Sequence, residues 1–494
     1  MDLPQFDALY VISDIHMGGK TDFQILHKTD RLTGFIGWLG LQKGEVALVL
    51  NGDVVDTLAE DFFGYVAVND AVKVIGQIMQ RPEFAPIWKA LGGFVQEPKH
   101  TLVFVLGNHD IELAFPNVQR MIVKQLSGDK AAVAPRIVFS TIGAGFPCRV
   151  GNSRVFCTHG NEVDAWNYIR YEDLSKAARR ISSGRLLEAS EWEPNAGTKL
   201  VKDVMNEVKQ KYRWIDLLKP ETSAAIGVLL ILDPGQLSKI DRIWPVAGKV
   251  IKGKGEFDQR LSIGRFSSSH IEDVTELPPD ALLGPSLTEA IGIGHYLKGD
   301  EMLLEAERAF QSGQTIESET DDATLGTGQY LLDRLTGWIR GVGEDEAMRR
   351  ALKDWLKDDK SFDIRHKDET YEGVMSSIGP DNHFVITGHT HLERAIADGP
   401  NYFYFNTGTW IRLLRFTEKI LENKKSFKKA YEVLMDGSMD AIDNAARQSN
   451  GFVLDHTSAV SICRDNKGGT VGTLLHVTGD GTTFETVGGP FRRK

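Results

Sequence analysis

Short runs of large apolar residues recur along the first third of the chain, and each run ends in polar residues and glycine. Such runs are typical of buried strands in a layered α/β domain. They lie at residues 8–13, 45–51, 101–106 and 154–158. Similar runs return at 383–387 and 402–406. We therefore expect one sheet that is completed from both ends of the chain, with the middle of the sequence forming an insertion.

Between about residues 166 and 374 the apolar positions change to helical spacing. One helix face is predicted from Val201, Val204, Met205, Val208 and Tyr212. A second face is predicted from Leu331, Leu335, Trp338 and Ile339. The stretch 312–328 is acidic and has few large apolar residues, which predicts a loop. The pattern indicates an insertion that is mainly helical.

The last part of the chain predicts further structure. Residues 417–447 have helical spacing, and residues 458–477 predict two strands joined by a turn at 466–469. A chain of 494 residues exceeds what one hydrophobic core usually supports. We divide it into the first part of a core, 1–165, a helical cap, 166–374, the second part of the core, 375–415, and a C-terminal extension, 416–494, whose helix and β-hairpin pack on the core.

A short polar motif follows each of five predicted strands. The motifs are Asp14-Ile15-His16, Gly52-Asp53-Val54-Val55-Asp56, Gly107-Asn108-His109-Asp110, His159-Gly160 and Gly388-His389-Thr390-His391. The carboxyl ends of strands gather loops at one edge of a sheet, so all five motifs are expected to meet. Carboxylate, amide oxygen and imidazole suit manganese, iron or zinc, while soft thiolates are missing from the motifs. The sequence therefore predicts a site for divalent metal ions.

The order and chemistry of these motifs resemble the calcineurin-like metallophosphoesterase family, whose hallmark runs are D-x-H, G-D-x-x-D, G-N-H-[ED], H and G-H-x-H. The resemblance covers roughly residues 8–165 and 380–412. It implies an α/β fold with a layered β-sandwich flanked by helices, here with a large, mainly helical insertion. It also implies that Asp14, His16 and His391 hold one metal ion, that Asn108, His159 and His389 hold a second, and that Asp53 bridges the two.

The resemblance further implies a hydrolase with a dinuclear metal centre. Two ions about 3.5–4 Å apart clamp a phosphate and activate a bridging hydroxide as the nucleophile. His109 is expected to act as the general acid, because an imidazole beside the phosphate can protonate the departing alkoxide. Asp110 and Asp56 are expected to orient imidazoles. Asp164, just after His159, is expected to cap a helix that begins near Ala165. We expect manganese, with iron and zinc as alternatives.

The charge of the chain helps to decide between the possible functions. The net charge of -11 and the pI near 5.7 oppose a surface that binds nucleic acid generally, because such surfaces collect Lys and Arg. We therefore expect a phosphatase or phosphodiesterase that hydrolyses a phosphate ester or pyrophosphate in a small or lipid-linked molecule. A nuclease acting on DNA or RNA is the second interpretation. A non-catalytic binding scaffold is the third, and the intact set of expected ligands argues against it.

Three cysteines without paired spacing fit a reducing cytoplasm. The longest apolar run, 224–232, is about half the roughly 20 residues that a membrane-spanning helix needs, so any membrane contact is expected to be peripheral. The eight histidines outside the five motifs, His456 among them, are interpreted as surface or satisfied polar residues.

Overall fold

The computed structural model describes residues 3–188, 192–219, 228, 231–232, 339–357, 359–448, 451–465 and 468–493. The loop predicted at 312–328 and most of the apolar run 224–232 lie outside the described residues. So do Leu331, Leu335 and Trp338 of the second predicted helix face, and half of the predicted turn at 466–469.

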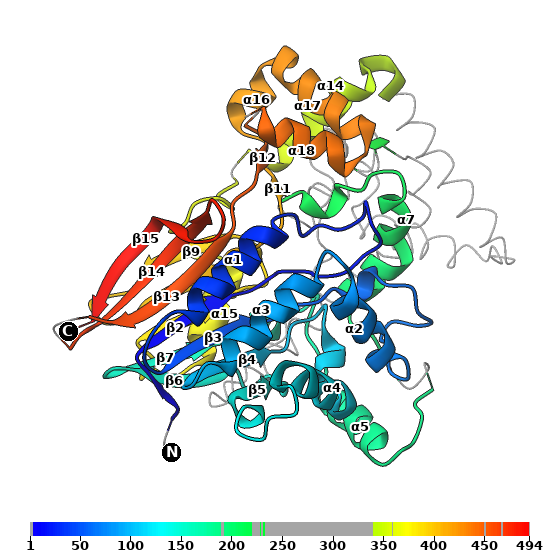
Figure 1. Cartoon of the computed structure of the whole chain (residues 1–494). Coiled ribbons are helices and arrows are strands. Elements are labelled where there is room, and N and C mark those ends of the chain that lie inside the picture. Colours follow the sequence, from blue (N-terminus) through cyan, green and yellow to red (C-terminus); the bar gives the residue numbers. More distant parts are fainter. Residues whose placement is uncertain are drawn as a thin grey trace, which may run out of the picture.

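The first sheet has seven strands in the order β15-β14-β13-β2-β3-β4-β5 (Figure 1). Their bounds are β2 (Ala8–Ile12), β3 (Val46–Asn51), β4 (His100–Val105), β5 (Ile137–Ser140), β13 (Ser458–Arg464), β14 (Thr470–Thr478) and β15 (Thr483–Arg493). Strands β2 to β5 are parallel, whereas the C-terminal strands pair antiparallel and join the sheet through β13 and β2. The C-terminal extension therefore completes the sheet that the N-terminus begins.

The second sheet has six strands in the order β1-β6-β7-β8-β10-β9. Their bounds are β1 (Gln5–Phe6), β6 (Phe146–Val150), β7 (Ser153–Cys157), β8 (Phe384–Thr387), β9 (Glu393–Ala397) and β10 (Phe403–Thr407). The expectation of a single sheet was wrong, because the late strand β8 pairs with β7, and β10 pairs with β8, so neither joins β2 to β4. The fold is the predicted layered α/β sandwich flanked by helices.

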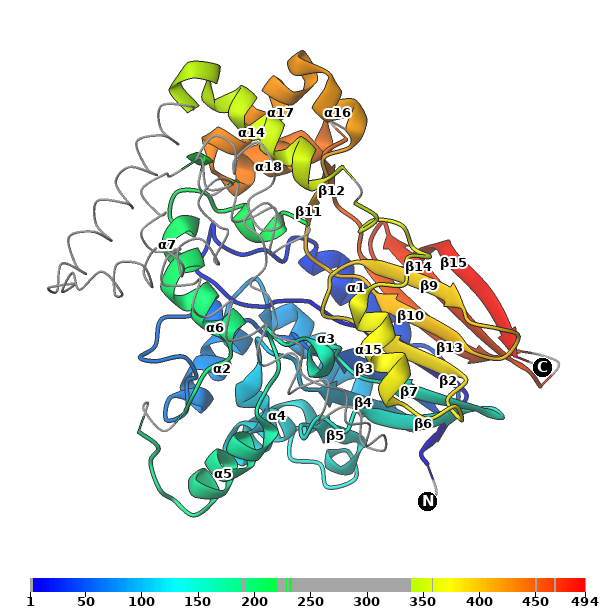
Figure 2. The ribbon, with the colours of Figure 1, turned by 180° about the vertical axis from the view of Figure 1, so that it is seen from behind.

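Side chains that point to opposite faces alternate along the strands of the first sheet, and they form an inner and an outer hydrophobic core. In β2, Leu9 and Val11 face the second sheet in the inner core, while Tyr10 and Ile12 face the helices of the outer core. The outer core is covered by α1 (Thr29–Gly40), α2 (Ala71–Gln80), α3 (Ala85–Gln96) and α4 (Pro116–Ser127). On α1 the buried residues Leu32, Phe35, Ile36 and Leu39 have the spacing of one helix face. The other sheet is covered by α15 (Glu369–Ser377) (Figure 2).

Helices from the insertion and from the C-terminal extension share one hydrophobic core. They are α7 (Asn206–Lys209), α14 (Glu344–Trp355), α16 (Glu418–Glu422), α17 (Lys424–Asp436) and α18 (Met439–Arg447). The short strands β11 (Leu413–Leu414) and β12 (Val453–Leu454) connect this helical unit to the sandwich. The indole N–H of Trp214 donates to the carbonyl of Leu434 at 2.6 Å, which ties the two segments together. Figure 1 shows α14 and α16 to α18 together at one end of the molecule.

The remaining helices of the described residues are short or peripheral. They are α5 (Tyr171–Ser182), α6 (Ala196–Leu200), a π-helical turn at Val201–Met205, and the 3₁₀ turns Thr57–Ala59, Ile111–Ala114, Ala134–Arg136, Asn161–Val163 and Ile215–Leu217. Within the described ranges, no helix has both the length and the apolar content to cross a membrane.

Candidate metal centre

The five polar motifs lie at the carboxyl ends of strands from both sheets. Asp14 and His16 follow β2, Asp53 follows β3 and Asn108 follows β4. His159 follows β7, and His389 and His391 follow β8. The sandwich thus brings six of the seven predicted ligands, all except Asn108, into two clusters from positions up to 377 residues apart in the sequence.

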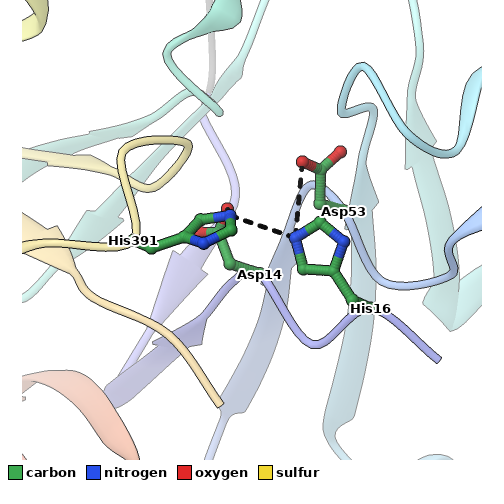
Figure 3. Close-up of side chains that lie close together, drawn as sticks. All are labelled: Asp14, His16, Asp53 and His391. Carbon is green, nitrogen blue, oxygen red and sulfur yellow. Dashed lines mark hydrogen bonds and ion pairs between the residues drawn. The ribbon is translucent and has the colours of Figure 1, made fainter. Parts of the chain in front are cut away.

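One cluster consists of Asp14, His16, Asp53 and His391, all buried (Figure 3). The Nε2 atoms of His16 and His391 are 3.1 Å apart, and His391 Nε2 is 3.2 Å from Asp14 Oδ1. Asp53 Oδ2 lies 3.9 Å from His16 Nε2. Ligand atoms bound at about 2.1 Å to one ion lie roughly 3 Å apart, so these spacings fit a shared cation.

A second cluster consists of Asp53, His159 and His389. Asp53 Oδ2 also lies 3.2 Å from His159 Nε2, so the same oxygen faces both clusters. Asn108 is buried as well, and its Oδ1 has no hydrogen-bond partner among the described residues.

Buried polar atoms without a hydrogen bond support an ion in each cluster. Asn108 Oδ1, Asp14 Oδ1 and His159 Nε2 are buried without a hydrogen bond to any described residue, although the last two lie 3.2 Å from His391 and Asp53. Leaving a buried polar group without a partner costs about 1–3 kcal/mol. Because all three atoms are metal-binding types in the predicted ligand set, the residues present fit two divalent cations.

Two imidazoles of the second cluster are held in orientation by hydrogen-bond partners on one of their ring nitrogens. His159 Nδ1 lies 2.8 Å from the carbonyl oxygen of Asn51, and His389 Nε2 lies 2.8 Å from Asp164 Oδ2. Such partners fix which ring nitrogen faces a metal. Asp164 was expected to cap a helix near Ala165. The structure has a turn there, stabilised by the Trp166 N–H donating to Asp164, and its next α-helix, α5, begins at Tyr171.

His109 borders the first cluster. Its backbone N–H donates to Asp53 Oδ1 at 2.8 Å, and its Nδ1 lies 3.1 Å from Asp56 Oδ1. Its side chain is 20% exposed, whereas those of His16 and His159 are 1% and 0% exposed. Asp56 Oδ2 lies 3.7 Å from His16 Nδ1, so Asp56 contacts two imidazoles. His109 is therefore the imidazole most accessible to a substrate.

Asp110 has different partners from Asp56. Its Oδ2 accepts the N–H of Val54 and its Oδ1 accepts the N–H of Gly107, each at 2.7 Å. These bonds hold the loop after β3 against the loop after β4. Burial, together with the charge of Asp53, raises the pKa of Asp110 to about 7. The contacts of Asp110 are with the backbone of the site and not with an imidazole, contrary to the role expected for it.

The electrostatics of the site favour cations. Burial alone would lower the pKa of His159, but the charges of Asp53 and Asp14 outweigh it and raise that pKa to about 10. In the first cluster, burial and the charge of Lys219 lower the pKa of His391 to about 4. The carboxylates thus impose a negative potential on the second cluster, while His391 stays neutral and able to bind a metal.

Five predicted ligands have strained backbones. Asp14, His16, Asp53, His389 and His391 all have φ between 51° and 71°. Residues other than glycine rarely adopt this left-handed conformation, and such strain concentrates at functional sites.

Close packing also explains two glycines beside the ligands. A Cβ on Gly107 would lie 2.1 Å from Asp53 Oδ1, and one on Gly388 would lie 2.6 Å from Asp14 Oδ2. Glycine is therefore needed at these positions for space.

One wall of the site is formed by residues at the end of β10 and just after it. The Thr409 hydroxyl and the Trp410 N–H both donate to the carbonyl of Asp14, at 2.9 and 3.2 Å. Asn406 Nδ2 donates to the carbonyl of Gly388 at 2.6 Å. These bonds support the two loops that carry Asp14 and His389. The polar residues 406–409, at the end of β10 and just after it, are the sequence signal that could have located this wall.

Comparison with known families agrees with this geometry. Residues 8–215 match the model of a family described as calcineurin-like phosphoesterase. The match includes four of the five motifs and Asp164. Searches against curated proteins and against solved structures gave no match.

Proposed function

We propose that this chain, whose residues 8–215 match the calcineurin-like phosphoesterase family, is a member of that family and hydrolyses its substrate at a dinuclear centre formed by the seven predicted ligands. The family implies metal-dependent hydrolysis of phosphoesters. One observation carries the assignment of this centre: Asp53 Oδ2 lies near His16 Nε2 on one side and His159 Nε2 on the other. A carboxylate oxygen between two clusters of nitrogen and oxygen ligands supports a bridging role for Asp53.

When bound, two divalent ions would neutralise the charge of the phosphoryl group and lower the pKa of an attacking water. The side chains of the site have the remaining tasks. Asp14 and Asp53 would supply negative charge that holds the ions, and the buried imidazoles would supply nitrogen ligands. The carbonyl of Asn51 and the carboxylate of Asp164 keep His159 and His389 in fixed orientations.

We assign His109 as the general acid. Burial raises the pKa of Asp56, but the neighbouring His109 and His16 outweigh that effect and hold it well below its ordinary value. Asp56 therefore remains a carboxylate that accepts the Nδ1–H of His109 and stabilises its protonated form. A protonated, partly exposed imidazole beside the clusters can donate its proton to a leaving alkoxide.

The ligand set supports manganese as the first choice of ion, because it contains carboxylate, amide and imidazole groups. We further propose a phosphorylated small molecule or a lipid-linked phosphate as the substrate, since the acidic chain is poorly suited to nucleic acid. The three cysteines are unpaired, which supports our proposal of a reducing cytoplasm.

The proposal is tested with metal-stripped protein before and after addition of Mn²⁺. The substrates are bis(p-nitrophenyl) phosphate and p-nitrophenyl phosphate, which separate diesterase from monoesterase activity. We expect turnover only with the metal, its loss in Asp53→Ala, and its retention in Asp129→Ala, which removes an exposed carboxylate. Equal turnover with and without metal would contradict the proposal.

A further inference from the structure

A second group of metal-binding side chains lies outside the candidate centre. Glu393, His456 and His476 each offer one ligand atom, and these atoms lie within 4.8 Å of one another. His476 Nε2 is 2.7 Å from Glu393 Oε1, and the rings of His456 and His476 are 4.3 Å apart. The three residues come from β9, from β14 and from the segment between β12 and β13, so the fold and not a local sequence motif brings them together.

The alternation of side chains along β14 and β9 explains why Glu393 and His476 are in contact. On β14, Leu474 packs in the inner core and Val477 in the outer core, so His476 points toward the space between the sheets. On β9, Ala395 packs in the inner core, so Glu393 also points inward. An ionisable pair therefore lies at the edge of the core between the two sheets, with Glu393 from one sheet and His476 from the other.

Space for an ion exists beside this pair. A cavity of about 210 Å³ is lined by Glu393, His456 and His476, together with Ser458, Thr409 and His391 of the candidate centre. Room for the Glu393 side chain depends on Gly408, whose φ is 68° and where a Cβ would lie 2.6 Å from Glu393 Cγ. His456 is exposed, so its ring can adjust toward an incoming ion.

Two imidazoles and one carboxylate, with a fourth position open to the cavity, form a ligand set that zinc uses in proteins. We propose that Glu393, His456 and His476 bind a third divalent ion of the zinc class, separate from the dinuclear centre. The ion links β9 to β14 across the two sheets. Because Glu393 follows His391 by two residues, it also holds the loop that carries His391.

The experiment measures zinc per chain by mass spectrometry after the protein is loaded and dialysed. We expect His456→Ala and His476→Ala each to lose one ion per chain relative to the wild type. His366→Ala, which removes an imidazole of a surface turn outside the histidine clusters of the described residues, should lose none. Asp53→Ala should lose the ions of the dinuclear centre but keep the third ion, which separates failure of this inference from failure of the proposed function.

A spectroscopic variant tests ligation directly and does not depend on stability. His456→Cys places a thiolate at the proposed ligand position, and Co²⁺ bound to it should give a thiolate-to-cobalt charge-transfer band. The wild type and His366→Cys should not give this band. Unchanged zinc content in both alanine variants, or absence of the band in folded His456→Cys, would overturn the proposal.

Discussion

Asp56 connects two imidazoles of the candidate centre that have different exposure. His16 is buried among the predicted ligands, whereas His109 is partly exposed beside them. The carboxylate is therefore placed to stabilise positive charge on His109. The proposed function depends on this division between imidazoles that would bind metal and one that would transfer a proton.

Substitution of His109 by Ala should affect esters according to their leaving group. Hydrolysis of an alkyl phosphate should fall by about 10²–10⁴-fold, the usual contribution of a general acid. A p-nitrophenyl ester should be affected much less, because nitrophenolate leaves without protonation. Steady-state kinetics with both esters checks this, and Asp56→Asn should give part of the same selective loss. An equal fall on both esters would contradict the general-acid role.

At the scale of elements, the loops after the strands need glycine for space. In Gly107→Ala the added Cβ would clash with Asp53 Oδ1, so we expect loss of metal binding and of activity. Gly37→Ala is the matched control, because it lies on the exposed face of α1 with open space around it. That control should be more stable by about 0.5–1 kcal/mol, since alanine is the better helix former. Metal content and thermal unfolding of both variants measure the effect, and full metal content in Gly107→Ala would contradict it.

The helical unit has a pH-dependent contact. Glu346 on α14 accepts hydrogen bonds from Arg349 and Arg350 and lies 3.6 Å from Lys424 at the start of α17. The hydrogen bond from Arg349 is the main cause that lowers the pKa of Glu346 to about 2. A carboxylate with a lowered folded-state pKa stabilises the fold above its unfolded pKa of 4.5, and this contribution is lost as the pH falls toward 2.

Glu346→Gln should therefore be less stable than the wild type by up to about 1 kcal/mol at pH 7. The difference should shrink steadily below about pH 4.5. Urea unfolding of both proteins at several pH values measures it. A stability difference that stays constant down to pH 3 would show that another property of the substitution is responsible.

The strands and the motifs after them could be predicted from the sequence because both signals are local. The run at 45–51 became β3 (Val46–Asn51), and the motif that begins at Gly52 follows it directly. The pairing of sheets could not be predicted, because alternation in β8 (Phe384–Thr387) does not specify its neighbour. The cluster of Glu393, His456 and His476 was missed for the same reason, since no spacing in the sequence relates its members.

At the scale of the whole molecule, the C-terminus is part of the sandwich. Strand β13 covers the edge of β2, and Val460, Ile462 and Leu474 fill the inner core. Removal of residues 455–494 would expose that edge and that core to water. We expect the truncated chain to be insoluble or unfolded, as judged by circular dichroism and gel filtration. A folded monomer that retains metal would show that the first 454 residues form an independent unit.

The central claim is that two ions share Asp53. Crystals grown with Mn²⁺ and measured at the manganese absorption edge test it most directly. The account predicts two anomalous peaks about 3.5–4 Å apart on either side of Asp53 Oδ2, one near His16 and His391 and the other near Asn108 and His159. A single peak, or peaks not in contact with Asp53, would contradict it.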